Sequence, residues 1–387
     1  MHKVIRLITI AMLVSLMLGA ASAQGDACFV EPEVMTTAEV VEFVRTPDAC
    51  FDNLPDWDYE PLYVEIDGLR QAYVDVGTGE SGETILLVHG QPAWSYLYRK
   101  MIPVLADAGH RVIAMDHVGM GRSDKPIDPD YYTYMGHVER METFIQELEL
   151  EQGNLTIFVQ DWGSLIGLNV IGRNTDWFDR VVLGNGRLPT TGNGGLTLND
   201  EGVAHSLPDN PRVTRQVYYS RITSMPEQQP MLRDVEGNLI EEANEGGFGI
   251  WIDYARNDER FRPSQIIEAE TWFDVSDEEL AAYDAPFPSR IYLGGPRAFP
   301  GLVNQMAGNT DEGWEGLGNY ENPFITIWGV NDPLVLGSPQ IQQQFIDHVP
   351  GAEGLVHVRL PEAGHFLQDD QGEDIARRVN EFIAQSQ

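Results

Sequence analysis

The sequence predicts an α/β fold: a mostly parallel central sheet, flanking helices and an inserted, mainly helical cap. Two observations predict it. From about residue 62 to residue 189, short apolar segments typical of buried strands alternate with longer segments of helical spacing. After Pro189 this alternation stops, Gly, Asn and Glu become frequent, and a convincing strand returns only at residues 324–328. This interruption is typical of an insertion between two strands of one sheet.

The expected elements follow one another with short connections. Residues 63–66 and 71–76 alternate in polarity around Asp67-Gly68, which predicts a hairpin. After the hairpin, apolar strands alternate with helices, and this alternation predicts that the strands pair in parallel. We expect those strands at 84–88, 111–115, 155–159, 181–183, 324–328 and 355–360, and helices at 94–108, 134–148, 164–171 and 375–383.

The beginning of the chain predicts a secretory signal peptide. Lys3 and Arg6 precede an apolar run at residues 7–18, and Ala21-Ser22-Ala23 is a small-residue cleavage site. The apolar run is short for a membrane span, so cleavage is favoured over a membrane anchor. We expect a secreted or periplasmic protein that does not associate with the membrane after cleavage. The expected segments are 1–23 signal peptide, 24–189 first part of the core with an N-terminal leader, 190–286 helical cap, and 287–387 second part of the core.

Cys28 and Cys50 are the two cysteines of the chain, and both lie in the leader. In an oxidising compartment they are expected to form a disulfide, and the alternative is two unpaired thiols. Closing a loop of this size contributes on the order of 3 kcal/mol of stability.

The charge of the chain excludes some partners. There are 25 Lys and Arg against 60 Asp and Glu, a net charge of −35, which argues against binding to nucleic acid or anionic membranes. The acidic residues are scattered, so they indicate no particular protein partner and no oligomeric state. No metal or nucleotide cofactor is indicated, because Gly119-Met120-Gly121 is a lone short glycine motif.

The segment 155–164 carries the central motif, a strand followed by a tight turn and a helix. Asp161 occupies the turn, where α/β-hydrolases place their nucleophile, and Gly163 allows the chain to turn closely. Val159 stands where the usual nucleophile motif has a small residue. The alternative is that Asp161 caps the helix N-terminus, a common role of Asp.

Three further segments support the nucleophile interpretation. Gln91 follows the expected strand 84–88, in the loop that donates a backbone N–H to the oxyanion hole of an α/β-hydrolase. Asp332 and His365 each follow a later strand. Either residue alone could be structural, but the order nucleophile, acid, histidine is that of the α/β-hydrolase fold. The sequence therefore predicts this fold with Asp161, Asp332 and His365 as catalytic residues.

An aspartate nucleophile indicates displacement at a saturated carbon. A serine attacking such a carbon would form an ether, which water does not readily cleave. A carboxylate forms an ester, whose carbonyl water can then attack. His365 would activate that water, because Asp161 is already ionised near neutral pH.

The segment from His89 to Pro103 resembles haloalkane dehalogenases, specifically the subfamily whose acid follows the later strand. The resemblance runs from about residue 45 to the C-terminus and is weakest between 190 and 245. Similar segments are Arg45-Thr46-Pro47-Asp48 with Phe51 and Asn53-Leu54, Gly121-Arg122-Ser123-Asp124-Lys125-Pro126, and Val159-Gln160-Asp161-Trp162-Gly163.

This resemblance implies a halide site and a substrate pocket. The indole N–H groups of Trp162 and Trp251 would hold the leaving halide, and Trp162 would share the oxyanion hole with Gln91. Trp251 could instead be a packing residue. Phe248, Phe287 and Pro288 resemble apolar positions that line the pocket. The implied partners are a halogenated alkane, halide ion and water.

Two positions depart from the resemblance. Gln91 stands where this subfamily commonly has Glu and its sister has Asn, so its side chain is expected to contact halide or water differently. The cap also contains an additional acidic stretch at residues 241–247. The sister subfamily carries its acid near Asn185, so the Asn there favours Asp332 as the acid.

Other functions remain open at this point. An epoxide hydrolase shares the Asp and His and needs paired cap tyrosines, for which Tyr218, Tyr219, Tyr254 and Tyr283 are candidates. A catalytically silent secreted binding protein is a second alternative, against which the full set of Asp161, Asp332 and His365 speaks. A serine esterase is poorly supported, because no serine occupies the turn.

Overall fold

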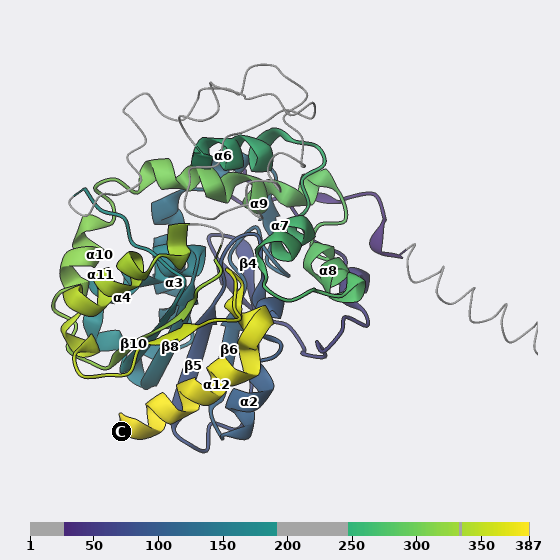
Figure 1. The fold of residues 1–387 in the computed structure, drawn as a ribbon. Helices are drawn as coiled ribbons and strands as arrows, with labels where there is room; N and C mark the ends of the chain where they lie inside the picture. Colours follow the sequence, from purple (N-terminus) through teal and green to yellow (C-terminus); the bar gives the residue numbers. More distant parts are fainter. Residues whose placement is uncertain (1–26, 192–246, 333–334, 387) are drawn as a thin grey trace, which may run out of the picture.

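The computed structural model describes residues 27–191, 247–332 and 335–386, and its centre is an eight-stranded sheet with the order β11-β10-β9-β8-β5-β6-β4-β3 (Figure 1). The strands β3 and β4 form an antiparallel hairpin, β4 pairs antiparallel with β6, and the other neighbours pair in parallel. The strands are β3 (Leu62–Ile66), β4 (Leu69–Val76), β5 (Glu83–Val88), β6 (Arg111–Met115), β8 (Asn154–Gln160), β9 (Arg180–Gly184), β10 (Phe324–Gly329) and β11 (Val358–Leu360).

Both faces of this sheet are covered. The consecutive β5 residues from Ile85 to Val88 are all fully buried, although they point alternately to the two faces. Among the surrounding helices, α2 packs beside α12, and α4 packs between α3 and α10. These helices are α2 (Ile102–Asp107), α3 (Tyr134–Glu147), α4 (Trp162–Arg173), α10 (Asp311–Leu317), α11 (Pro339–His348) and α12 (Leu367–Gln385). The predicted α/β architecture is confirmed.

One predicted helix is divided in the structure. Residues 94–108 were expected to form a single helix, but they form the 3-10 helix η2 (Ser95–Tyr98) and the short helix α2. Helix α2 begins at Ile102, which places Pro103 in its first turn. Proline is tolerated there because the first-turn N–H groups have no partner within the helix, whereas an interior proline would break a longer helix.

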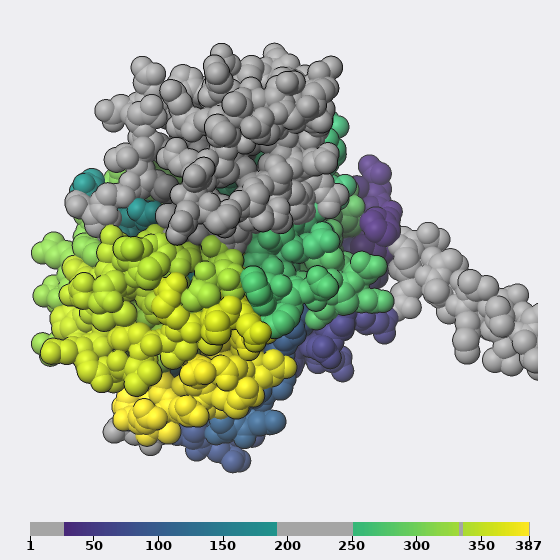
Figure 2. Space-filling model, viewed as in Figure 1, coloured from purple at the N-terminus to yellow at the C-terminus, as the bar shows by residue number. Residues whose placement is uncertain are grey.

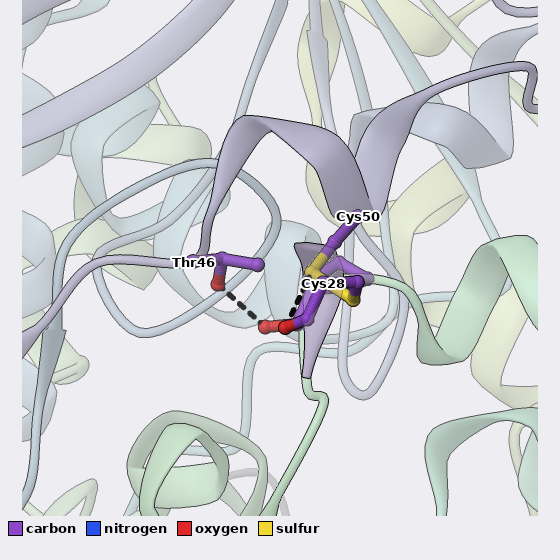
Figure 3. Close-up of a disulfide and its surroundings, with 4 residues drawn as sticks. Cys28, Thr46 and Cys50 are labelled. Carbon is purple, nitrogen blue, oxygen red and sulfur yellow. Dashed lines mark hydrogen bonds between the residues drawn. A yellow bond between two sulfur atoms is a disulfide. The ribbon is translucent and has the colours of Figure 1, made fainter. Parts of the chain in front are cut away.

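The leader forms strands that the sequence analysis did not predict. Strand β1 (Val34–Thr36) pairs antiparallel with β2 (Glu42–Val44), which pairs in turn with β7 (Lys125–Pro126). The predicted disulfide between Cys28 and Cys50 is present, with their Cα atoms 4.6 Å apart (Figure 3). Thr46 Oγ1 donates a hydrogen bond to the Pro286 carbonyl at 2.7 Å. The leader is therefore fixed both to itself and to the segment that follows helix α8 (Asp277–Asp284).

Helices inserted between β9 and β10 lie above one end of the central strands (Figure 1). The indole N–H of Trp94 donates to the Ala282 carbonyl in α8, which joins this insertion to the core. Figure 2 shows green atoms of this insertion in contact with the yellow C-terminal segment. The helices are α6 (Gly247–Asn257), α7 (Pro263–Glu270), α8 (Asp277–Asp284) and α9 (Gly294–Ala298).

Several predictions concern residues outside the described ranges. The signal peptide at 1–23, Tyr218, Tyr219 and nearly all of the acidic stretch at 241–247 belong to this group, and the boundaries of the predicted segments stay predictions. Within the described ranges, no helix combines the length and the apolar character needed to cross a lipid bilayer.

Candidate active site

Asp161 lies at a sharp turn between β8 and α4. Its backbone has φ 51° and ψ −128°, a strained conformation for a residue other than glycine. Gly163 allows this turn to pack closely on β5, because a Cβ at that position would lie only 2.2 Å from the Val88 carbonyl oxygen. The Asp161 carboxylate makes no hydrogen bond to the first turn of α4. The alternative role as a helix cap is therefore not adopted.

The two oxygens of the Asp161 carboxylate have different partners. Oδ1 accepts a hydrogen bond from the Gln91 backbone N–H at 2.7 Å, and Oδ2 lies 3.3 Å from His365 Nε2. Gly90 permits this approach, since a Cβ there would lie 2.2 Å from Oδ1. The structure thus brings the predicted oxyanion loop, the predicted nucleophile and the predicted base together at the ends of β5, β8 and β11.

His365 is held from its other nitrogen by Asp332, whose Oδ2 lies 2.7 Å from His365 Nδ1. A carboxylate only accepts hydrogen bonds, so Nδ1 carries a proton. Asn185 donates to the same Asp332 oxygen at 2.8 Å, and it also bonds both the carbonyl and the N–H of Gly329. Sequence analysis assigned Asn185 no role of its own. Its position after β9, beside the strand that carries Asp332, was the available signal.

The charge of His365 depends on these two carboxylates. Burial of the ring opposes its protonation, but the negative charges and hydrogen bonds of Asp332 and Asp161 outweigh burial and raise the pKa of His365 well above its ordinary value. The resting site therefore favours an imidazolium between two carboxylates. Loss of the charge on Asp161 would remove part of this stabilisation.

Comparison with known proteins agrees with this geometry. The family model described as alpha/beta hydrolase fold matches residues 83–220. A haloalkane dehalogenase of Psychrobacter cryohalolentis is 36% identical over 353 residues, which cover 89% of this chain and 98% of that protein. The chain belongs to the haloalkane dehalogenase family. The predicted resemblance and the predicted α/β-hydrolase fold are both confirmed.

Other members of the family are similar over the same extent. A haloalkane dehalogenase of Mycobacterium marinum is 37% identical, over 88% of this chain and 99% of that protein. Among solved structures, the tetrameric haloalkane dehalogenase of Paraglaciecola agarilytica matches with a TM-score of 0.65 and 28% identity, over 87% of this chain and 97% of that one.

In this haloalkane dehalogenase family member, the two predicted halide tryptophans are both buried. Trp162 directly follows Asp161, and its ring contacts Phe299 with the ring centres 5.4 Å apart. Trp251 lies in α6, where its ring centre is 5.8 Å from that of Phe261. Both indoles thus have apolar neighbours, as a site for a large, weakly hydrated anion requires, and their role in halide binding stays a prediction.

Of the three predicted pocket residues, two lie just after α8 and one belongs to α6. Phe287 is buried, with Lys125 Nζ 5.8 Å from its ring centre, and Pro288 beside it is half-buried. Phe248 belongs to α6, but its side chain is outside what the structure describes. The pocket-lining role of these residues stays a prediction.

The side chain of Gln91 connects the oxyanion loop to the cap. Its Nε2 donates to the Pro296 carbonyl in α9 at 2.9 Å. Behind the same loop, His89 donates from Nδ1 to the Gly90 carbonyl and accepts the His117 backbone N–H at Nε2. The loop is therefore held in place by protein contacts on both sides.

Within the described ranges, no group of three or more His, Cys, Asp or Glu side chains could hold a metal ion.

Proposed function

We propose that this protein hydrolyses haloalkanes to the primary alcohol, halide and a proton, through a covalent alkyl-aspartate intermediate. The observation that best supports this is the Asp161 carboxylate at the strained turn, with Oδ1 bound by the Gln91 N–H and Oδ2 beside His365. One oxygen is thus held by an oxyanion donor, and the other faces the proposed base.

In the first half of the reaction, an Asp161 oxygen attacks the halogen-bearing carbon. A carbon–oxygen bond forms, the carbon–halogen bond breaks, and the halide leaves with its electron pair. The indole N–H groups of Trp162 and Trp251 would donate hydrogen bonds to the departing halide, since an indole N–H is a donor only. This step requires no base, because the attacking carboxylate is already ionised.

In the second half, water attacks the carbonyl carbon of the Asp161 ester. His365 Nε2 takes a proton from this water, and Asp332 stabilises the resulting imidazolium. The negative charge that develops on the ester oxygen is stabilised by the Gln91 and Trp162 backbone N–H groups. Collapse of the tetrahedral intermediate releases the alcohol, which takes the proton from His365, and the regenerated acid ionises to the Asp161 carboxylate.

The epoxide hydrolase alternative is less well supported. The Tyr254 hydroxyl donates to Gln265 Oε1 at 2.9 Å, and the Tyr283 hydroxyl is bound to Asp369. Burial also raises the pKa of Tyr283 well above its ordinary value. These two tyrosines are therefore engaged with other residues, whereas an epoxide hydrolase needs a pair of free hydroxyls facing the nucleophile.

A substrate panel tests the proposed function. We expect the purified protein to release halide from bromo- and chloroalkanes with one alcohol formed per halide, and to leave styrene oxide unchanged. Ion chromatography of halide with chromatographic detection of the alcohol measures both products. Diol formation from styrene oxide without halide release from any haloalkane would favour the epoxide hydrolase instead.

The halide role of Trp251 predicts a selective loss. Trp251→Phe keeps an aromatic ring but removes the N–H donor, so we expect halide affinity to fall roughly tenfold while the fold is retained. Product inhibition of turnover by added bromide measures this affinity. Trp314→Phe is the matched control, because Trp314 of α10 stacks on His348 of α11 and is half-buried. Equal bromide inhibition in Trp251→Phe and the unaltered protein would exclude Trp251 from the halide site.

We further propose that the protein is exported with removal of residues 1–23, as Lys3, Arg6 and the Ala21-Ser22-Ala23 site indicate. The disulfide in the leader is consistent with an oxidising compartment. The intact mass of the exported chain checks this proposal, since it should correspond to a protein that begins at Gln24. A mass that includes residues 1–23 would contradict it.

A further inference from the structure

A buried amide lies against the proposed base. Gln160 is the last residue of β8 and precedes Asp161, and its side chain is fully buried. Its Nε2 donates to the His365 backbone carbonyl at 3.0 Å and lies 3.3 Å from His365 Nε2. One amide group thus touches both the backbone and the ring of the histidine.

The orientation of this amide follows from its partners. A backbone carbonyl only accepts hydrogen bonds, so the Gln160 atom beside the His365 carbonyl is the nitrogen. On the opposite side, Gln368 Nε2 approaches Gln160 Oε1 at 3.5 Å, as this orientation requires. The second N–H of Gln160 is then directed towards His365 Nε2. Nε2 can accept this hydrogen bond only when it carries no proton.

Other side chains around His365 favour its protonated, positively charged form. Asp161 and Asp332 contact the two ring nitrogens, and both carboxylates stabilise an imidazolium. From α7, the Glu270 backbone carbonyl accepts the His365 N–H, and from α12 the Asp370 carboxylate accepts the Gly364 N–H. Of the described side chains that contact the ring nitrogens, Gln160 therefore favours the neutral form and the two carboxylates favour the cation.

We propose that Gln160 is a positioning residue for His365, which holds the ring in place and favours its neutral form during hydrolysis of the ester. This inference rests on the proposed function. Alkylation of Asp161 removes one negative charge beside the ring, so Asp332 alone then opposes the effect of Gln160. His365 becomes a neutral base, and the Gln160 contact with its Nε2 is long enough, at 3.3 Å, for a water to replace it at the lone pair. After Nε2 takes the proton from water, the imidazolium faces the Gln160 N–H, which favours transfer of that proton to the departing alcohol oxygen.

The two halves of the reaction provide a specific test. In Gln160→Met, a bromoalkane should still release about one halide per active site, because Asp161 attacks without a base. Hydrolysis of the ester should be about tenfold slower, since a displaced base transfers its proton less well. The apparent pKa of this step should also rise. In Gln160→Glu it should rise further, and the rate should recover at alkaline pH, because the added carboxylate stabilises the imidazolium.

Gln71→Met is the matched control for this experiment. Gln71 is also a buried glutamine of the central sheet, but it lies in β4, which β6 and β5 separate from β8. Rapid-quench measurement of halide, alcohol and alkylated protein across pH separates the two steps. Wild-type hydrolysis rates and pH dependence in Gln160→Met would overturn the proposal. An equal loss of the halide burst and of hydrolysis would also overturn it, because that result indicates a structural role.

A second measurement does not depend on activity. In the Asp161→Asn background, the nucleophile carries no charge, as in the ester. The 15N imidazole signals of His365 should then titrate at a higher pH when Gln160 is also replaced by Met, and an unchanged midpoint would overturn the proposal. If the unaltered protein released no halide from any haloalkane, the proposed function would fail, while this titration would still decide whether Gln160 controls His365.

Discussion

His365→Ala is expected to release about one halide per active site from a good bromoalkane and then to stop. Asp161 is ionised and needs no base to displace the halide, whereas attack of water on the ester needs His365 Nε2. The protein should therefore gain the mass of the alkyl group on the peptide that contains Asp161. Quenched-flow halide detection and peptide mass spectrometry measure the two quantities.

Two variants serve as controls for this experiment. Asp161→Ala should release no halide and gain no mass, because no carboxylate remains to be alkylated. His110→Ala should behave like the unaltered protein, since His110 bonds Ser81 near the start of β5 and β6. Normal turnover by His365→Ala, or a label on a residue other than Asp161, would contradict the mechanism. A binding protein would show neither a burst nor a label.

Arg99→Met is expected to lower the free energy of unfolding by about 3–5 kcal/mol. The Arg99 guanidinium is fully buried, and it bonds Glu279 of α8 at 2.6 Å and also Asp369 of α12. It donates to the Tyr283 hydroxyl at 3.3 Å as well. Removal of the cation leaves the buried Asp369 and the partly buried Glu279 without their guanidinium partner. The variant should also loosen the contact between the cap and the C-terminal helix that Figure 2 shows.

The pH dependence of this effect has a defined sign. Burial disfavours the charge on Glu279, but hydrogen bonds from Arg99 and Ser276 outweigh it and lower the pKa of Glu279 from 4.5 to about 2. A carboxyl group with a lowered pKa stabilises the fold above its unfolded pKa, and this contribution is lost as the pH falls through its folded pKa. The stability difference between Arg99→Met and the unaltered protein should therefore shrink as the pH falls from about 4.5 to about 2.

Urea unfolding at a series of pH values measures this difference. Arg378→Met is the control, because Arg378 forms a partly exposed ion pair with Asp374 within α12 and should contribute less than about 1 kcal/mol. Similar stability losses in the two variants would contradict the argument that burial makes the Arg99 cluster costly to disrupt.

Patterns local in the chain determined much of this protein. The apolar strands could be predicted because β5, β6, β8, β9 and β10 bury consecutive side chains on both faces of the sheet. The turn at Asp161, the loop at Gln91 and the positions of Asp332 and His365 followed because the ends of parallel strands meet at one edge. The family resemblance added the two tryptophans, and the Cys28–Cys50 disulfide followed from cysteine number and an oxidising compartment.

Tertiary structure alone decided how these residues are held. Asn185 fixes Asp332, Gln160 contacts His365, and the Gln91 side chain bonds the Pro296 carbonyl. The Arg99 cluster joins segments that are 180 and 270 residues away from it in the chain. Such contacts have no local sequence signal, because a buried polar side chain takes whichever partner the packing of distant segments brings within reach. The sequence predicted which residues form the site, and the folded chain decided how they are held.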